Sequence, residues 1–200
     1  MKKIFLVFIA MFLMCGTVSA AMIEEGSSVA VMDFSPHKGT SDADVELMNS
    51  EKVVSDYIIQ ELISTEKFNV IDKEIQSDLL DGLNLVGVIN PETAKKIGER
   101  LNVRYIIYGN VMSVTIDDKA AVVVNVHTVH ARLTARIMDV ETGKILMMAK
   151  GEGKSDGASL GDESSLIAIG NVKVSQESVH NALMKASFQA VDTLVERLFK

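Results

Sequence analysis

The distribution of apolar residues divides the chain into segments of two kinds. Short apolar runs such as 28–34 and 105–109 have the length and composition of buried strands. Longer segments such as 45–65 place apolar residues four and seven positions apart, which predicts helices with one buried face. In that helix the face consists of Leu47, Val54, Ile58 and Leu62. The succession of the two kinds indicates a sheet covered by amphipathic helices.

Polar residues that cap helices mark where the later helices begin. Asp72 precedes a helix predicted from Lys73 to about residue 83. Asn90-Pro91-Glu92 supplies an N-cap, a proline at the first helical position and an acid in the first turn. Ser175 precedes a final helix that we expect to pack on the sheet. Its buried stripe is predicted to contain Leu183, Ala186, Ala190, Val191, Leu194 and Leu198.

Strand-forming residues dominate from 104 to 139. We expect a strand over 104–116, a turn at 117–119 and a second strand over 120–139, which together form a hairpin near 111–135. A strand as long as the second would outrun a small domain at about 3.3 Å per residue. It must therefore bend, bulge or project beyond the sheet.

Glycines determine what we expect of the segments that follow. Gly143, within 141–144, predicts a turn into an antiparallel strand over 145–150. The segment 151–175 contains five glycines and five serines and has no clear hydrophobic period. We therefore predict a flexible loop there.

These elements predict a single α/β (α+β) domain over residues 21–200. Its sheet should be mixed, with about five strands flanked by amphipathic helices in the order β-α-β-α-α-β-β-β-α. The strand at 28–34, the helix at 45–65 and a short strand at 68–71 predict a right-handed crossover and a parallel pair. The two predicted hairpins supply the antiparallel strands.

The first twenty residues have the pattern of a secretory signal peptide. Lys2 and Lys3 form a positive n-region, residues 4–14 form a short apolar run, and Val18-Ser19-Ala20 places small residues before a cut. Because the apolar run is too short to span a bilayer as a helix, we expect cleavage after Ala20. The mature protein is therefore expected in the periplasm or another space bounded by the outer membrane.

Charge and cysteine content restrict the function further. The formal net charge of −7 becomes −9 once Lys2 and Lys3 are removed, which argues against nucleic acid and anionic membrane surfaces as partners. Cys15 is the single cysteine, so the mature protein has no thiolate nucleophile, thiolate metal site or internal disulfide. Lipidation at Cys15 is disfavoured, because Phe12-Leu13-Met14 lacks the small residues usual before a lipid-carrying cysteine.

Few residues have the spacing that catalysis or metal binding requires. His127 and His130 are three apart on a predicted strand, so they point to opposite faces and do not chelate one ion. Asp33 and His37 stand at the carboxyl end of the first strand, where open α/β sheets place ligands. A hydrolase or ligand-binding enzyme that uses Asp33 and His37 is therefore one alternative. We expect no enzyme, no cofactor and no metal site.

Apolar residues outside the expected core mark a candidate protein-contact surface. They lie in the 111–135 hairpin and in the segment 151–175, neither of which a compact core requires. The candidate residues are Val122, Val124, Val126, Leu166, Ile167 and Ile169. We expect this surface to contact envelope proteins or a second copy of the chain.

Four blocks of sequence occur in a characteristic order. They are Val29-Ala30-Val31-Met32-Asp33-Phe34, then Phe68-Asn69-Val70-Ile71-Asp72, then 94–98 running into 103–109, and then 135–146. With the alanine-rich last helix, they resemble the CsgG-like family over most of residues 27–199.

The resemblance implies a fold, an envelope location and a non-enzymatic role. The family includes the curli secretion channel subunit and is similar in fold to periplasmic lipoproteins that activate penicillin-binding proteins. Curli channel subunits insert two hairpins into the outer membrane, and the corresponding segments here are 112–135 and 151–175. A protein-binding or assembly module is thus the leading hypothesis, and an oligomeric outer-membrane export pore is its alternative. The second segment argues against membrane insertion, because its apolar part is confined to 166–169.

Overall fold

The computed structural model describes residues 23–36, 50–81, 89–120, 125–158, 166–169 and 172–200. Its elements are β1 (Ser27–Val31), β2 (Ser35–Pro36), α2 (Ser50–Ser64), β3 (Phe68–Val70), α3 (Lys73–Leu80), α4 (Pro91–Leu101), β4 (Tyr105–Ala120), β5 (Asn125–Asp139), β6 (Ile145–Ala158), β7 (Leu166–Ile169), β8 (Val172–Ser175) and α5 (Gln176–Leu198). Among these residues, the predicted order β-α-β-α-α-β-β-β-α is confirmed, with the short strands β2, β7 and β8 in addition.

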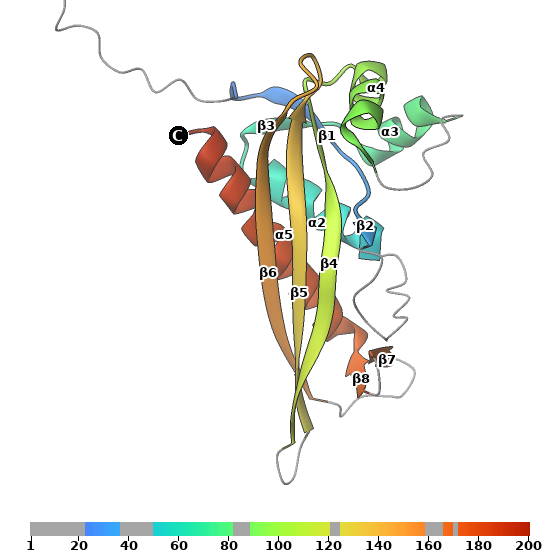
Figure 1. Ribbon diagram of the computed structural model, residues 1–200, viewed down its shortest axis with the longest axis vertical. Helices are drawn as coiled ribbons and strands as arrows, with labels where there is room; N and C mark the ends of the chain where they lie inside the picture. Colours follow the sequence, from blue (N-terminus) through green and yellow to red (C-terminus); the bar gives the residue numbers. More distant parts are fainter. Residues whose placement is uncertain (1–22, 37–49, 82–88, 121–124, 159–165, 170–171) are drawn as a thin grey trace, which may run out of the picture.

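The main sheet combines parallel and antiparallel strands (Figure 1). Its order is β3-β1-β4-β5-β6, and β2 pairs with β4. β1 runs parallel to β3 and β4, whereas β4, β5 and β6 are antiparallel to their neighbours. The predicted mixed sheet is therefore confirmed. β7 and β8 form a separate two-stranded sheet.

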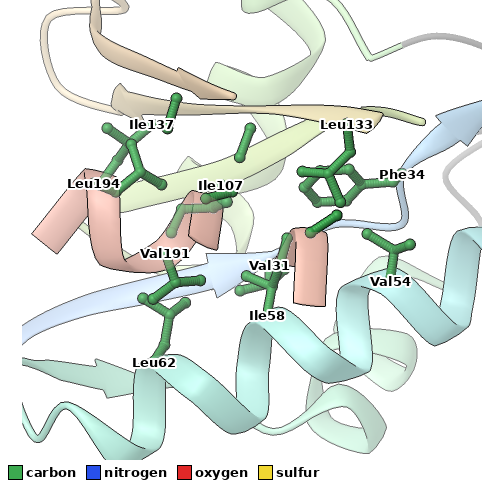
Figure 2. Close-up of a cluster of buried hydrophobic side chains, with 14 of the residues drawn as sticks. Val31, Phe34, Val54, Ile58, Leu62, Ile107, Leu133, Ile137, Val191 and Leu194 are labelled. Atoms are coloured by element: carbon green, nitrogen blue, oxygen red, sulfur yellow. The ribbon is translucent and has the colours of Figure 1, made fainter. Parts of the chain in front are cut away.

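Helices cover both sides of the sheet at the end of β1, which explains why Val29, Ala30 and Val31 are all apolar and buried. On one side, Val31 and Ile107 pack with α2 and α5 in a large apolar cluster (Figure 2). On the other side, Ala30 and Ile106 pack with α4 in a second cluster. The described residues that were predicted to be buried in the first and last helices all lie in the large cluster: Val54, Ile58, Leu62, Leu183, Ala186, Ala190, Val191, Leu194 and Leu198. Ala94, Ile97 and Leu101 of α4 lie in the second cluster.

The predicted helix starts are confirmed by their capping hydrogen bonds. The side chains of Asp72, Asn90 and Ser175 accept backbone N–H groups of the first turns of α3, α4 and α5 at 2.7, 2.8 and 3.2 Å. Each cap satisfies a donor that has no partner within the helix. Helix α4 ends at Asn102, which adopts a left-handed conformation with φ 52°.

The strands β4, β5 and β6 are longer than the helical layers require, at 16, 15 and 14 residues. The bend, bulge or projection was predicted for the strand over 120–139, whereas the bulge in this hairpin lies on β4, between Val111 and Ser113. The turn predicted at 117–119 is wrong, because these residues continue β4 and pair with β5 as far as Ala120 opposite Asn125. Cross-strand pairing over the whole hairpin outweighs the local turn preference of the charged residues.

The loop predicted at 151–175 is wrong for the residues that the structure describes. β6 continues through Gly151 to Ala158, and β7 and β8 account for the other described residues of this segment. The glycines of β6 face α5, and a Cβ at Gly151 or Gly153 would overlap the carbonyl oxygen of Ala186 or Ala182. These glycines therefore permit close packing of a helix on a strand, and they do not indicate a turn.

Side chains of α5 also bond to the backbone of β6, which is an edge strand of the main sheet. The side-chain oxygen of Gln189 accepts the Glu152 N–H at 2.6 Å. Lys185 Nζ donates to the Lys154 carbonyl oxygen at 3.0 Å. Helix α5 thus occupies part of the hydrogen-bonding edge that a strand at this position exposes.

Gly153→Ala should destabilise the protein strongly, because the added methyl group meets the backbone of α5 and forces the two elements apart. We expect the free energy of unfolding, measured by urea denaturation, to fall by about 3 kcal/mol. The neighbouring variant Glu152→Ala, which changes an exposed side chain, should lower it by less than about 0.5 kcal/mol. Equal effects of the two variants would contradict the close-packing interpretation.

Candidate protein-contact surface

The structure describes part of the predicted contact surface. Val122 and Val124 lie outside the described residues. Val126 lies in β5, paired with Ala158 of β6. The other candidate residues are Leu166, Ile167 and Ile169, and all three belong to β7. β7 pairs with β8, which leads directly into α5, so these candidates stand on a short paired ribbon.

A larger candidate surface is the side of β4, β5 and β6 that faces away from α5. Figure 1 shows α5 crossing one side of these strands, while α3 and α4 lie beside the upper end of the sheet. Side chains alternate between the two sides of a strand. On β5, Val129, Ala131 and Leu133 are buried in the cluster with α5, and Arg132 between them is exposed. The strands therefore have one closed face and one open face.

The open face is defined by alternate residues of the three strands. They are Met112, Thr115 and Asp117 of β4, Thr128, His130, Arg132 and Arg136 of β5, and Met148, Lys150, Glu152, Lys154 and Asp156 of β6. Met112 is 36% exposed and Met148 is 49% exposed. Flexible methionine side chains adapt to irregular apolar surfaces, which is useful on a binding face.

Some charged side chains of the open face have a hydrogen-bond or ion-pair partner, and others form no ion pair. Asp117 Oδ2 lies 2.9 Å from His130 Nε2, and Asp156 accepts a hydrogen bond from the Thr128 hydroxyl at 2.7 Å. Within the described parts of the chain, four cationic side chains of this face form no ion pair, and they are Arg132, Arg136, Lys150 and Lys154. Arg132, Arg136 and Lys150 lie in strands that the sequence predicts, whereas Lys154 lies in the segment predicted as a loop. The sequence did not show that pairing of β5 with β6 brings all four cations to one face.

Arg136 influences a buried phenol at one end of the open face. Burial raises the pKa of Tyr108, and the positive charge of Arg136 opposes part of that rise. The Tyr108 hydroxyl and the Thr134 hydroxyl are buried and have no hydrogen-bond partner within the described structure. Tyr108 belongs to the apolar cluster that contains α4, and Thr134 lies on β5 two residues before Arg136, the cross-strand partner of Tyr108.

The two strand histidines lie on opposite sides of β5, as their spacing predicts. His127 is 6% exposed and lies on the side of β5 that faces α5. His130 lies on the open face beside Asp117. Among the residues that the structure describes, no group of three or more His, Cys, Asp or Glu side chains is arranged to hold a metal ion.

Asp33 belongs to a network that sequence reasoning did not find. Its carboxylate accepts from the Ser55 hydroxyl at 3.0 Å and forms an ion pair with Lys73. Lys73 Nζ also donates to Ser55 Oγ at 2.5 Å and lies 3.6 Å from Asp56 Oδ1. The network ties the end of β1 to α2 and α3, and its partners are 22 and 40 residues from Asp33 in sequence. His37 lies outside the described residues.

The fold is a mixed sheet with helices on both sides and a long extension of three antiparallel strands. The family model described as "Curli production assembly/transport component CsgG" matches residues 14–200. The chain therefore belongs to the CsgG family. A search of curated proteins finds no match.

Several solved structures are similar to this chain at low sequence identity. The LpoB C-terminal domain from Escherichia coli is 16% identical with a TM-score of 0.46, and the match covers 68% of this chain and 87% of that one. Lipoprotein GNA1162 from Neisseria meningitidis is 13% identical with a TM-score of 0.47, covering 69% and 88%. A PelC dodecamer from Paraburkholderia phytofirmans is 15% identical with a TM-score of 0.43, covering 84% and 91%.

In the parts of the chain that the structure describes, no helix is both long enough and apolar enough to cross a membrane.

Ser55→Ala tests whether the Asp33 network supports the fold. Ser55 is fully buried, and its hydroxyl bonds to Asp33, Lys73 and the Lys52 carbonyl oxygen. We expect the substitution to lower the free energy of unfolding by about 1 kcal/mol in urea denaturation. Ser64→Ala removes a similar hydroxyl-to-carbonyl bond at an exposed position of α2 and should cost less than about 0.5 kcal/mol. A Ser55→Ala protein as stable as Ser64→Ala would contradict a supporting role.

Proposed function

We propose that the mature protein is an exported, non-enzymatic protein of the cell envelope that acts by binding other proteins, as an assembly module of the CsgG type. Membership of the CsgG family supports this proposal. The observation that carries it is the open face, which presents exposed charged and methionine side chains on three long paired strands.

The open face is suited to binding because it is rigid before a partner arrives. β5 is paired on both sides along most of its length, and α5 packs against the opposite side of the strands. A preorganised surface loses little conformational entropy on association. The apolar candidates Val122, Val124, Val126, Leu166, Ile167 and Ile169 are proposed to extend the contact beyond the open face.

The proposed location follows from the N-terminal segment. A positive n-region, a short apolar run and small residues before Ala20 favour export and cleavage. The proposed site of action is therefore the periplasm or another space bounded by the outer membrane. The proposed partners are envelope proteins or a second copy of the chain.

Asp33 gives little support to an enzymatic alternative. Its carboxylate is already engaged with Lys73 and Ser55, which link three structural elements. An assembled catalytic group would instead face a substrate site. The export-pore alternative predicts extraction only with detergent and large rings in electron microscopy, whereas the proposed module is expected in the soluble envelope fraction.

Site-specific photo-crosslinking tests the proposed function in intact cells. A benzoylphenylalanine in place of Thr115 stands on the open face, and one in place of Asp192 stands on an exposed position of α5. We expect discrete protein adducts from position 115 at several times the yield from position 192. Mass spectrometry of the adducts identifies envelope proteins or the chain itself. Equal yields, or no adduct at position 115, would contradict binding through the open face.

A further inference from the structure

The unpaired cations of the open face form a regular ladder. In the β5–β6 register, Arg136 pairs with Met148, Thr134 with Lys150, Arg132 with Glu152, and His130 with Lys154. We call each of these four cross-strand pairs a level of the ladder. Each level contributes one permanent cation, alternately from β5 and β6. At two residues per level, neighbouring levels are roughly 7 Å apart along the strands. On these four levels of β5 and β6, Glu152 is the one carboxylate. Asp117 of β4 lies beside His130 at the end of the ladder.

We propose that this ladder binds an acidic extended segment of a partner protein, with carboxylates at every second residue. In an extended segment, alternate side chains point to the same side and recur at roughly 7 Å, which matches the spacing of the levels. The inference rests on the proposed function and names the chemistry of its partner. Met148, at the Arg136 level, offers an apolar contact beside the charges.

Charge complementarity favours a protein over an anionic membrane as the occupant. The chain as a whole has a formal net charge of −7, so it is repelled at long range by a negative lipid surface. Opposite charges of a partner are attracted once they approach within the Debye length of about 8 Å at physiological salt. The ladder is a local positive feature on an acidic molecule, which selects a narrow acidic segment over a broad negative surface.

Two labelled peptides of equal composition test the spacing and the charge. One alternates glutamate and serine over eight residues, and the other places the four glutamates before the four serines. We expect the alternating peptide to bind more tightly in fluorescence anisotropy, with an affinity that falls as salt rises. In nitrogen-15 NMR spectra, the backbone signals that move on binding should belong to 130–136 and 148–154.

Charge reversal on the ladder provides the matched comparison. Arg132→Glu with Lys150→Glu should weaken binding of the alternating peptide by about tenfold or more. Lys52→Glu with Lys144→Glu makes the same change in net charge at exposed positions off the open face, and should alter binding by less than about threefold. If the reversal variant unfolds, Arg132→Gln with Lys150→Gln replaces it and should weaken binding in the same direction.

Three results would overturn the inference. They are the absence of peptide binding, equal loss of binding in the two charge-reversal variants, and binding to phosphatidylglycerol vesicles in place of the peptides. The crosslinking at position 115 separates this failure from failure of the proposed function. If adducts persist unchanged in the reversal variant, the protein binds partners but not through an acidic segment. If adducts are absent from both proteins, the proposed function itself fails.

Discussion

The close approach of α5 to β6 is the constraint on which the rest of the structure depends. Gly151 and Gly153 lie against the carbonyl groups of Ala186 and Ala182, at positions where a side chain would not fit. Because the backbones meet, α5 buries the inner side of β5 and β6 with small residues, and the larger apolar residues are concentrated nearer to β1. The helix and the strands therefore behave as one layered unit that extends past the α3 and α4 layer.

This arrangement divides the molecule into a region that stabilises the fold and the open face that we propose for recognition. Near β1 both sides of the sheet are covered, and the apolar clusters there include α2, α4 and α5. Farther along β4, β5 and β6, α5 stabilises one side only, so residues on the other side are free to vary without disturbing the core. A surface held rigid from behind is well placed to recognise a partner, while its sequence determines which partner fits.

Local signals made much of the fold predictable, and long-range contacts explain what was missed. Asn90 and Ser175 act through hydrogen bonds to adjacent turns, so sequence alone located the starts of α4 and α5. A glycine in the sequence can indicate either a turn or close packing of two backbones. Gly151 packs against Ala186 of α5, which is far from it in the sequence. Charged and small residues alternate strictly from 150 to 157, which is typical of a strand. The many glycines in this segment led us to predict a loop there. Because 151–158 was predicted as a loop, the β5–β6 register that brings Lys154 beside the cations of β5 was not foreseen. The apolar contact candidates stay a prediction.

The side chains of α5 that bond to the β6 backbone have a consequence for association between copies of the protein. Gln189 and Lys185 bond to backbone groups of Glu152 and Lys154 on the outer edge of β6. Without α5 in place, this edge would have unsatisfied donors and acceptors that favour pairing with strands of other chains. Docking of α5 therefore shields the edge of the sheet as well as burying one of its sides.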